Sequence, residues 1–567
     1  MYFYETTLIQ KHLNFSSLNR STFINQLQQQ QFDLLVIGGG ITGAGIALDA
    51  ISRGLSVALI DMQDFSAGTS SRSTKLIHGG LRYLKQLDFK LVAEVGKERK
   101  IIHAIAPHLT RPEPMLLPIV KNGSLGKASA RIGMWVYEWL AGVKKEEWHK
   151  VLSVEETLHR EPLLAKENLL AGILFYEYRT DDARLTIEVL KEAVNKGVVA
   201  VNYIKATNFI YSNEKISGAL ACNQLTNETF NIKAKYVVNA CGPWVDELDS
   251  IDKKQEEHKL KLTKGVHFVV DWKKLPVKQS LYFDTFDKRM LFIIPREGKT
   301  YLGTTDTFYS DAKINPNITN EDRTYLLKCI NDFFPNNNLQ ISDIESAWVG
   351  LRPLISKPGK GPSEISRKDE LFETKSGLLT IAGGKLTGYR KMAQRIVDKI
   401  ATKIKTSDNK IVTDCVTQHI HLSGGQIHIS KEFDNFVSTQ VIAGLDLGLT
   451  DAESKILIHR YGSNVSIIYN LIKQLKTESS ELPVIIRAQI HYTIHYEMCM
   501  SISDFVIRRT GMLYFDIASV KKWNNNMAIY MQQLLALDTN LQNRFLDELN
   551  DKLKSLEKLR IENGLDK

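Results

Sequence analysis

The hydrophobic and polar positions between residues 32 and 61 predict a strand, a turn, a helix and a second strand, in that order. Apolar residues run from Phe32 to Ile37, and a second apolar run from Ser56 to Ile60 leads to an acid, Asp61. Between them lie a glycine-rich turn and an amphipathic stretch that ends at Gly54. This order is typical of a complete βαβ unit.

The glycines of the turn have the spacing G-x-G-x-x-G, carried by Gly38, Gly40 and Gly43. In dinucleotide-binding folds the first glycine turns the chain, the second admits the diphosphate and the third lets the helix pack on the strand. The diphosphate then lies at the helix N-terminus. An acid at Asp61 suits ribose hydroxyls and disfavours a 2′-phosphate, so FAD or NAD is expected rather than NADP. The competing interpretation is an ordinary tight turn.

The rest of the chain continues this mixed pattern. Apolar residues at helical spacing predict a helix over 87–105 that ends before Pro107, and short apolar runs between turns favour an antiparallel sheet over 281–352. Strands are predicted over 236–240 and, after a turn, within 262–270; a helix is predicted over 323–334; and a last strand, glycine turn and helix are predicted over 378–404.

These elements divide the chain into four regions. Residues 1–30 form an N-terminal extension, 31–404 one interleaved sheet system, 405–425 a linker, and 426–567 a helical region. The extension is either disordered or packed on the C-terminal helices; both alternatives remain open. No internal repeat is visible.

Residues 131–145 combine Trp135, Tyr137 and Trp139 with basic residues at both ends. Such a segment fits either an amphipathic helix at a bilayer surface or a helix buried on the core. The sequence does not decide between the two.

Composition narrows the class of protein. The 567 residues are 43% hydrophobic and 24% charged, as in a soluble globular chain. The net charge is +9, and the basic residues are interspersed with acidic ones, which favours anionic substrates or an acidic membrane surface over nucleic acid as the binding partner. Five cysteines without a C-x-x-C pair suggest a reducing compartment and no zinc or iron-sulfur site. We expect no secretion signal, and no apolar run reaches the length of a membrane span, so any membrane contact should be peripheral.

Eight further segments resemble, in their order and spacing, those of the FAD-dependent glycerol-3-phosphate dehydrogenases. The resemblance covers roughly residues 30–535 and includes the helical end (460–462 and 491–510). The segments are STKLIHGGLRYL (73–84), DDARLT (181–186), NACGPW (239–244), LTKGVHFVV (262–270), GTTDT (303–307), GLRPL (350–354), ISRKDE (365–370) and GGKLTGYR (383–390).

This resemblance implies an α/β fold: a glutathione-reductase-type FAD-binding domain with an inserted antiparallel-sheet substrate domain and a helical C-terminal cap domain. The FAD-binding domain is implied to be discontinuous over 31–404, with the substrate part interleaved in it at roughly 111–175 and 262–370. It implies oxidation of sn-glycerol 3-phosphate to dihydroxyacetone phosphate by hydride transfer to FAD. Electrons then pass to a membrane quinone, with the protein peripheral on the cytoplasmic face of the membrane. A homodimer is a further implication.

The resemblance also assigns a substrate site. His267 is the expected base, since imidazole titrates near neutral pH, although a structural histidine at the start of a strand is the alternative. Arginine forks suit a phosphate, and the charge of Arg352 lies between apolar neighbours, where an unpaired charge would be costly. The matching residues are Arg82, Tyr83, His267, Arg352, Arg367 and Lys385.

A larger set matches the cofactor site of the family. Lys385 and the backbone N–H groups of the helix that follows are expected to hold the anionic edge of reduced flavin, and Thr387 is expected to cap that helix. No metal is expected, and His491 and His495 are interpreted as packing residues. The cofactor set is Gly38, Gly39, Gly40, Thr42, Gly43, Asp61, Thr69, Ser70, Ser71, Ser73, Thr74, Leu76, His78, Ala240, Gly242, Gly384, Lys385, Leu386 and Thr387.

Three other functions compete with this one. A glycerol-3-phosphate oxidase uses the same site with oxygen as acceptor, but such relatives carry an insertion for which 267–385 looks too compact. An amine or amino-acid oxidoreductase of the same fold would not need three arginines and a lysine. A flavin-binding scaffold without turnover would not need a base together with a phosphate clamp.

Overall fold

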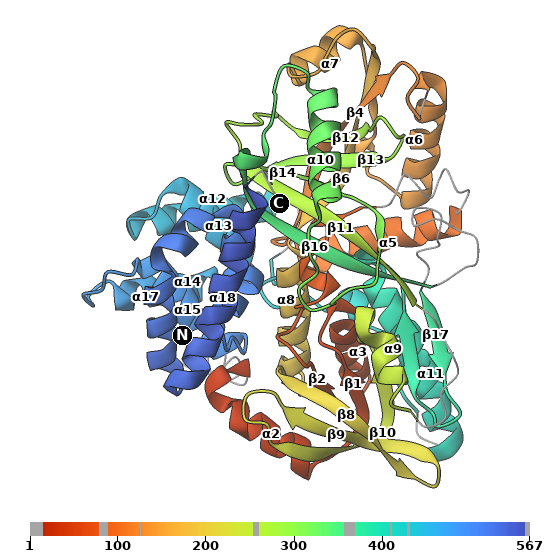
Figure 1. The fold of residues 1–567 in the computed structure, drawn as a ribbon. Coiled ribbons are helices and arrows are strands. Elements are labelled where there is room, and N and C mark those ends of the chain that lie inside the picture. Colours follow the sequence, from red (N-terminus) through yellow and green to blue (C-terminus); the bar gives the residue numbers. More distant parts are fainter. Residues whose placement is uncertain are drawn as a thin grey trace, which may run out of the picture.

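The computed structural model describes residues 15–78, 89–124, 126–252, 260–355, 369–408, 411–427 and 431–561. Within these ranges the chain forms two β-sheets and a group of C-terminal helices (Figure 1). The first sheet lies at the bottom of the view, the second above it, and the C-terminal helices beside both. This is the predicted α/β architecture with an antiparallel insertion and a helical C-terminal region.

The first sheet is parallel at its centre and has eight strands in the described part of the chain. β1 lies between β10 and β2, and the parallel pairing continues to β18 and β7. In spatial order the strands are β17 (Glu370–Glu373), β18 (Leu379–Ala382), β10 (Thr229–Asn239), β1 (Gln31–Ile37), β2 (Val57–Ile60) and β7 (Val199–Val201), with β9 (Lys215–Asn223) on β10 and β8 (Ile204–Ser212) on β9.

Helices cover this sheet, and α3 packs between two of them. They are α3 (Ile41–Ser52), α8 (Asp182–Asn195) and α11 (Tyr389–Asp408). Strands covered by helices are expected to be apolar along their length, and Leu34 to Ile37 of β1 are all buried. Because β1, β2, β10 and β18 run parallel, the turns after them meet at one edge of the sheet.

The second sheet is mostly antiparallel and has ten strands in the described residues. In spatial order the strands are β15 (Thr307–Tyr309), β11 (Leu260–Asp271), β14 (Lys299–Gly303), β13 (Met290–Arg296), β12 (Ser280–Asp284), β4 (Thr110–Val120), β6 (Leu169–Thr180) and β3 (Leu76–Ile77), with β16 (Ile344–Ile355) on β11 and β5 (Lys150–Leu152) on β6. The accompanying helices are α5 (Phe89–Ile105), α6 (Lys127–Ala141), α7 (Val154–Arg160) and α10 (Asn320–Phe333), whereas α9 (Val245–Asp249) contacts β10 and β18 of the first sheet.

One prediction in this sheet is wrong in detail. Residues 262–270 were expected to form a turn followed by a strand, but β11 is a single strand from Leu260. Its lysine, Lys264, is buried, and its Nζ lies 2.5 Å from Asp322 Oδ2 on α10. The charge of Lys264 is therefore neutralised inside the strand by a partner that is distant in sequence.

The C-terminal region is helical, as predicted. Its helices are α12 (Lys431–Asp446), α13 (Asp451–Tyr461), α14 (Val465–Leu475), α15 (Val484–Tyr496), a π-helical turn η10 (Asp504–Arg509), α16 (Met512–Phe515), α17 (Ile517–Leu535) and α18 (Thr539–Leu559). The predicted linker starts inside α11, which extends to Asp408. His491 on α15 has its Nε2 2.8 Å from the hydroxyl of Tyr530, in keeping with a packing role.

Short 3-10 turns connect these elements: η2 (Ser17–Asn19), η3 (Thr69–Ser71), η4 (Lys145–Glu147), η5 (Gly242–Trp244), η6 (Ile341–Asp343), η7 (Leu386–Gly388), η8 (Thr417–His419) and η9 (Gly462–Asn464).

The described part of the N-terminal extension is packed rather than free. It contains α2 (Arg20–Gln29), whose Arg20 donates to Asn202 Oδ1 at 2.9 Å. The hydroxyl of Ser17 donates to the carbonyl oxygen of Cys499 at 2.7 Å. This segment therefore joins the first sheet to the C-terminal helices, which favours the packing alternative.

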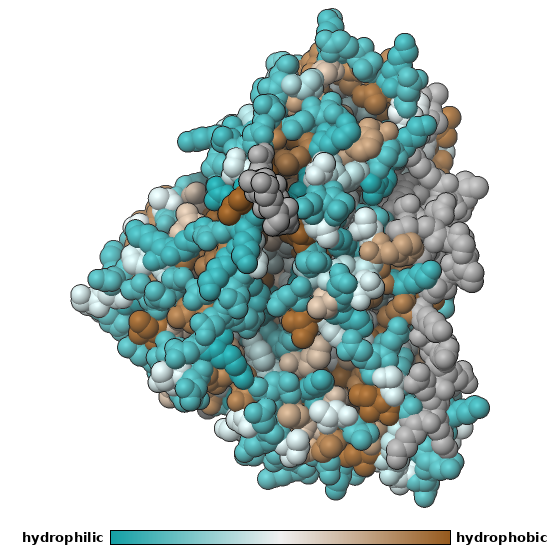
Figure 2. Space-filling view, viewed as in Figure 1, coloured by the Kyte–Doolittle hydropathy of each residue, from teal (hydrophilic) through white to brown (hydrophobic). Residues whose placement is uncertain are grey.

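Helix α6 has one buried and one exposed apolar face. Met134 and Tyr137 are buried, whereas Ile132, Trp135 and Trp139 are 64%, 53% and 70% exposed. The surface is otherwise mostly hydrophilic, with small hydrophobic groups, some of them beside α6 (Figure 2). The buried face of α6 fits the alternative of a helix packed on the core, and the exposed face fits the alternative of an amphipathic helix at a bilayer surface. Among the described helices, none has the length and apolar character needed to cross a bilayer.

Candidate active site

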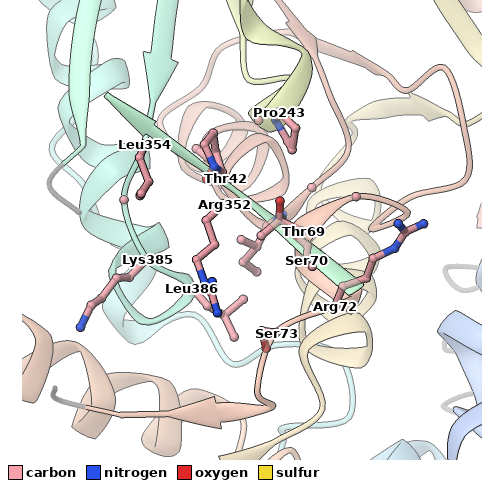
Figure 3. A pocket seen from close by; sticks show the side chains of 18 of the residues that line it. Thr42, Thr69, Ser70, Arg72, Ser73, Pro243, Arg352, Leu354, Lys385 and Leu386 are labelled. Atoms are coloured by element: carbon pink, nitrogen blue, oxygen red, sulfur yellow. The ribbon is translucent and has the colours of Figure 1, made fainter. Parts of the chain in front are cut away.

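An elongated cavity of about 710 Å³ lies where the edge of the first sheet meets the second sheet. It is lined by the turn after β1 of the first sheet and by residues of β11, β12, β13 and β16 of the second sheet. Figure 3 shows side chains from several of these elements converging on it. The parallel strands of the first sheet therefore deliver their turns to the same space as the strands of the second.

Glycine is required at two positions of the first turn. Gly38 has a φ of +113°, and a Cβ there would lie 2.5 Å from the carbonyl oxygen of Ala240. A Cβ on Gly43 would lie 1.9 Å from the carbonyl oxygen of Gly38, so this glycine allows α3 to pack on β1. Gly40, at the N-cap of α3, has no side chain that could cap the helix, so the N-terminus of α3 lies at the cavity, where it can face a diphosphate.

Asp61 lines the same end of the cavity, at the end of β2. Its carboxylate accepts hydrogen bonds from the backbone N–H of Gly39 at 2.7 Å and of Gln63 at 2.8 Å. Burial raises the pKa of Asp61 to about 7. A carboxyl group held in this way can exchange hydrogen bonds with ribose hydroxyls, so the residues present fit the adenosine end of FAD.

The loop after Asp61 ties the two sheets together. The hydroxyl of Ser70 accepts from the N–H of Ile41 at 3.0 Å, and that of Thr69 donates to the carbonyl oxygen of Leu351 at 2.6 Å. The N–H of Ser73 donates to Asp182 Oδ2 at 2.9 Å. The loop is therefore held from both sides, as a wall around a cofactor requires.

Most of the predicted cofactor residues line this cavity. Gly39, Gly43 and Ser71 lie behind its wall; Gly39 orients Asp61, and the carbonyl oxygen of Ser71 accepts from Lys75 Nζ at 3.1 Å. The lining members are Gly38, Gly40, Thr42, Asp61, Thr69, Ser70, Ser73, Thr74, Leu76, His78, Ala240, Gly242, Gly384, Lys385, Leu386 and Thr387.

The second glycine turn closes the other side. Gly384 has a φ of +83°, and a Cβ there would lie 2.4 Å from Met392 Sδ on α11. Lys385 precedes η7, and its side chain points away from Arg352 (Figure 3). Thr387 lies inside η7, two residues before α11 begins at Tyr389. Its expected role as the cap of that helix stays a prediction.

His267 lies within β11, opposite Gly303 on β14 and Trp348 on β16. Its Nε2 is 3.0 Å from the hydroxyl oxygen of Thr74. The imidazole stacks on Trp348, with ring centroids 4.8 Å apart and planes at 11°. A Cβ on Gly303 would lie 2.4 Å from His267 Cδ2, so this glycine provides the space for the ring. The alternative interpretation, a structural histidine, placed His267 at the start of a strand, but the residue lies in the interior of β11, which begins at Leu260.

The pKa of His267 lies well below its usual value of 6.5. Burial is the main cause, and the positive charges of Arg352 and Lys75 add to it. The expectation that this imidazole titrates near neutral pH is therefore wrong. The ring is neutral at pH 7, which is the form that can accept a proton.

Arg352 on β16 lies beside Gly265 of β11. A Cβ on Gly265 would be 2.2 Å from Arg352 Nη2, so the guanidinium occupies the space that this glycine leaves. Nη1 lies 3.2 Å from Asp306 Oδ1, and Nη2 donates to the hydroxyl of Thr304 at 3.1 Å. Gly265 and His267 are two residues apart on one strand, so Arg352 and His267 share a face of the sheet.

Some residues of this end were not assigned from the sequence. Thr304 and Asp306 belong to the GTTDT segment, which was recognised without a role for either residue. Trp348 carries no local signal, because its stacking depends on strand register. Three predicted residues, Arg82, Tyr83 and Arg367, lie outside the described residues.

Comparison with known proteins agrees with this geometry. A family model described as FAD dependent oxidoreductase matches residues 33–390, and one described as the C-terminal domain of alpha-glycerophosphate oxidase matches 415–542. The aerobic glycerol-3-phosphate dehydrogenase of Bacillus subtilis (strain 168) is 50% identical over 538 residues, which cover 94% of this chain and 97% of that protein. That of Staphylococcus haemolyticus (strain JCSC1435) is 50% identical over 537 residues, covering 94% and 96%.

Solved structures lead to the same group. The glycerol-3-phosphate dehydrogenase from Bacillus halodurans, complexed with FAD, has a TM-score of 0.82 and 44% identity and covers 95% of this chain and 98% of that one. The L-alpha-glycerophosphate oxidase from Mycoplasma pneumoniae, at a TM-score of 0.55 and 19% identity over 68% of this chain and 97% of that one, shares the fold alone. The chain therefore belongs to the family of FAD-dependent aerobic glycerol-3-phosphate dehydrogenases, with FAD as its cofactor.

Proposed function

We propose that this protein oxidises sn-glycerol 3-phosphate to dihydroxyacetone phosphate by hydride transfer to FAD and passes the electrons to a membrane quinone. The observation that carries the proposal is the position of His267 and Arg352 on one face of the second sheet. Both line the cofactor cavity. A base and a phosphate-binding cation are thereby placed together in the same cavity as the glycine turn.

His267 is the base in this proposal. Its neutral imidazole takes the proton of the substrate hydroxyl while the flavin, when bound, accepts the two electrons and the hydrogen from the adjoining carbon. The stacked Trp348 fixes the plane of the imidazole ring, and the hydroxyl of Thr74 lies within hydrogen-bond distance of its Nε2. The ring of His267 is therefore held in one orientation in this proposal.

Arg352 binds the substrate phosphate. Thr304 and Asp306 orient its guanidinium, which can present a planar pair of donors to phosphate oxygens. Arg82, Tyr83, Arg367 and Lys385 complete the substrate site on the strength of the resemblance. This concentration of cations supports a phosphorylated alcohol over an amine or an amino acid.

The acceptor is a quinone and the protein is peripheral on the cytoplasmic face of the membrane. The exposed face of α6, with two tryptophans and an isoleucine, supports contact with a bilayer surface. The net charge of +9 supports attraction to anionic lipids. A lipid-soluble acceptor is then within reach of a protein that does not span the bilayer.

The test is an anaerobic titration of the FAD-loaded protein with sn-glycerol 3-phosphate, followed by flavin absorbance. We expect bleaching that a quinone analogue reverses much faster than oxygen does. Faster recovery with oxygen would instead identify an oxidase, and a flavin that does not respond to the substrate would overturn the proposed reaction.

A further inference from the structure

A second cavity lies between the second sheet and the C-terminal helices. Its volume is about 240 Å³, and it shares no lining residue with the cofactor cavity. Its walls come from the segment before β4, from β4, from the ends of β6 and β13, from the start of α8, and from α13. The charged residues of these walls are Arg111, Arg179, Asp181, Arg184, Arg296, Glu297, Lys455 and Arg460.

Two of the arginines lie directly opposite each other on neighbouring strands. Arg111 of β4 pairs in register with Arg179 of β6. Like charges in this position are destabilising unless something neutralises them. Arg179 has a nearby acid, with its Nε 3.5 Å from Glu113 Oε2. For the guanidinium of Arg111 we find no hydrogen bond or ion pair within the described residues.

The acids near Arg111, Glu297 of the cavity and Glu113, offset only part of the effect of burial and of the neighbouring arginines on its pKa. Asp181 and Glu297 both contact Arg296, at 3.3 Å and 3.1 Å. Arg460 of α13 donates to neutral acceptors, the side-chain oxygen of Gln489 at 2.6 Å and the carbonyl oxygen of Thr510 at 2.7 Å. The cavity therefore has excess positive charge on both of its sides.

The pKa values of neighbouring groups reflect this positive charge. Burial, together with the charges of Arg179 and Arg296, lowers the pKa of Arg111 to about 10. Burial, together with Arg111 and Arg179, lowers the pKa of His459 to about 3. Added protons are thus disfavoured in this space, and an anion would be favoured.

Buried polar atoms on six of the lining residues have no hydrogen-bond partner in the described part of the chain. They are both ring nitrogens of His108, Nδ1 of His459, the hydroxyl of Thr180, Nε of Arg179 and of Arg184, and Nη1 of Arg296. His108 is 1% exposed and Thr180 is 3% exposed. Buried polar groups in native proteins are nearly always paired, so seven such atoms around one cavity indicate a missing polar ligand.

We propose that this second cavity binds a small molecule carrying a dianionic phosphate group, either inorganic phosphate or a small phosphate monoester. Guanidinium groups at Arg111 and Arg179 match the geometry of phosphate oxygens, and Thr180 and Arg296 add donors. The volume is below the ~300 Å³ at which pockets for larger organic ligands begin, so a nucleotide is excluded. The bound anion would bridge β4 and β6 to α13.

The experiment measures binding of labelled inorganic phosphate to the FAD-loaded protein at fixed ionic strength, by equilibrium dialysis. An Arg352→Met background weakens binding at the proposed substrate site and so isolates the second cavity. Adding Arg111→Met should weaken phosphate binding at least about tenfold, as expected for loss of a charged hydrogen-bond donor. Thr180→Val, which changes no charge, should weaken it about threefold.

Arg160→Met in the same background is the matched control, because it removes the same charge from an exposed position on α7. It should leave phosphate binding unchanged. Equal binding in the Arg111→Met and Arg160→Met proteins, both with full flavin content, would overturn the proposal. Dialysis with 2-phosphoglycolate distinguishes a monoester from free phosphate, and tighter binding of malonate than of either would overturn the phosphate class.

Discussion

Arg352 and His267 share one face of the second sheet, and the positive charge of Arg352 also affects the pKa of His267. The cation next to the imidazole helps to keep its pKa low, so the ring stays neutral in the presence of the group that attracts the substrate. A buried imidazole beside a cation would lose more by protonation than an exposed one. The same arginine can therefore serve both binding and the protonation state of the base.

The acid limb of the pH profile should report this coupling. The neutral form of His267 accepts the proton, so activity is lost as pH falls through its pKa, which lies below 6.5. In Arg352→Ala one positive neighbour is removed, and the acid limb of kcat/KM should move to higher pH. The phosphate group of the free substrate titrates identically in experiments with either protein, so it cannot cause a difference between their pH profiles. Profiles from pH 5 to 8 with superimposable acid limbs would contradict the coupling.

Arg352→Ala should also lower kcat/KM for sn-glycerol 3-phosphate by about 10- to 150-fold, the effect of losing a charged hydrogen bond of ~1.5–3 kcal/mol. Flavin content should stay unchanged, since the turns that surround the cofactor come mainly from the first sheet.

His267→Ala should lower turnover by about 10²- to 10⁴-fold. Steady-state kinetics with flavin absorbance as the loading control check both, and near-normal turnover in either variant would refute the assigned role.

At the scale of single residues, the sequence predicted several members of the site but not the contacts between them. His267 and Arg352 were found through family motifs, and Gly38 and Gly43 through their spacing. Asp306 and Trp348 were not assigned roles, because their contacts depend on the register of β11 with its neighbours. Register is a property of the folded sheet, and no local pattern of these strands encodes it.

Among the secondary-structure elements, prediction succeeded where hydrophobic periodicity was undisturbed. The segment from β1 to β2 and the helix α11 follow their patterns closely. It failed at β11, where the buried Lys264 is neutralised by Asp322 on α10. A charge that finds its partner far along the chain cannot be distinguished from an exposed one by its local sequence.

Helix α6 carries a prediction of its own. Trp135→Ser with Trp139→Ser should reduce binding to vesicles that contain anionic lipid, because two exposed aromatic side chains are lost from one face. Turnover with a soluble acceptor should not change. Trp272→Ser, at a residue 41% exposed outside α6, is the matched control. Vesicle sedimentation that ranks the three proteins equally would exclude α6 as the contact face.

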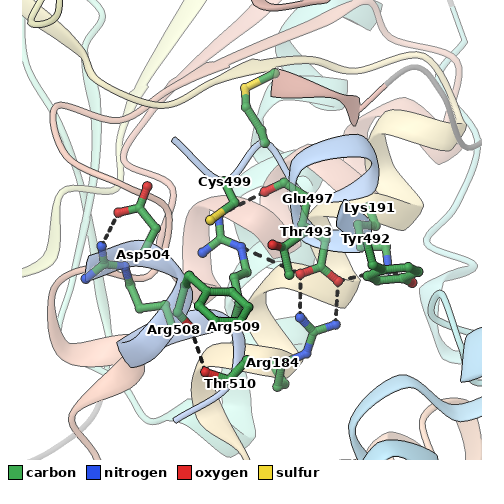
Figure 4. Close-up of polar contacts among 12 residues, drawn as sticks. Arg184, Lys191, Tyr492, Thr493, Glu497, Cys499, Asp504, Arg508, Arg509 and Thr510 are labelled. Carbon is green, nitrogen blue, oxygen red and sulfur yellow. Dashed lines mark hydrogen bonds and ion pairs between the residues drawn. The ribbon is translucent and has the colours of Figure 1, made fainter. Parts of the chain in front are cut away.

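In the whole molecule, buried ion pairs join the C-terminal helices to the first sheet. Glu497 accepts from Arg184 of α8 at 2.6 and 2.8 Å (Figure 4). Asp64, after β2, accepts from Arg508 at 2.5 Å and from Arg509 at 2.7 Å. These contacts connect residues hundreds of positions apart, so the sequence could indicate a helical region but not its attachment.

Glu497→Gln tests the importance of this attachment. The carboxylate is fully buried, and the charges of Arg184 and Lys191 oppose the effect of burial and hold its pKa at about 2. Removing its charge leaves Arg184 paired only with Glu188 in the interior, so the free energy of unfolding should fall by about 3–5 kcal/mol. Because the folded pKa is depressed, the stabilisation is full above the unfolded pKa of about 4.3 and is lost as pH falls towards 2. The difference between wild type and variant should therefore be constant near neutral pH and shrink in acid.

Denaturant unfolding of the FAD-loaded proteins at pH 7 and pH 4, followed by circular dichroism, measures both effects. Asp332→Asn is the control, since it removes one charge from the exposed pair with Lys328 and should change stability by less than about 1 kcal/mol. If Glu497→Gln were no more destabilising than Asp332→Asn, the ion pair with Arg184 would not hold the C-terminal helices, and apolar packing of α15 and η10 would have to account for the attachment.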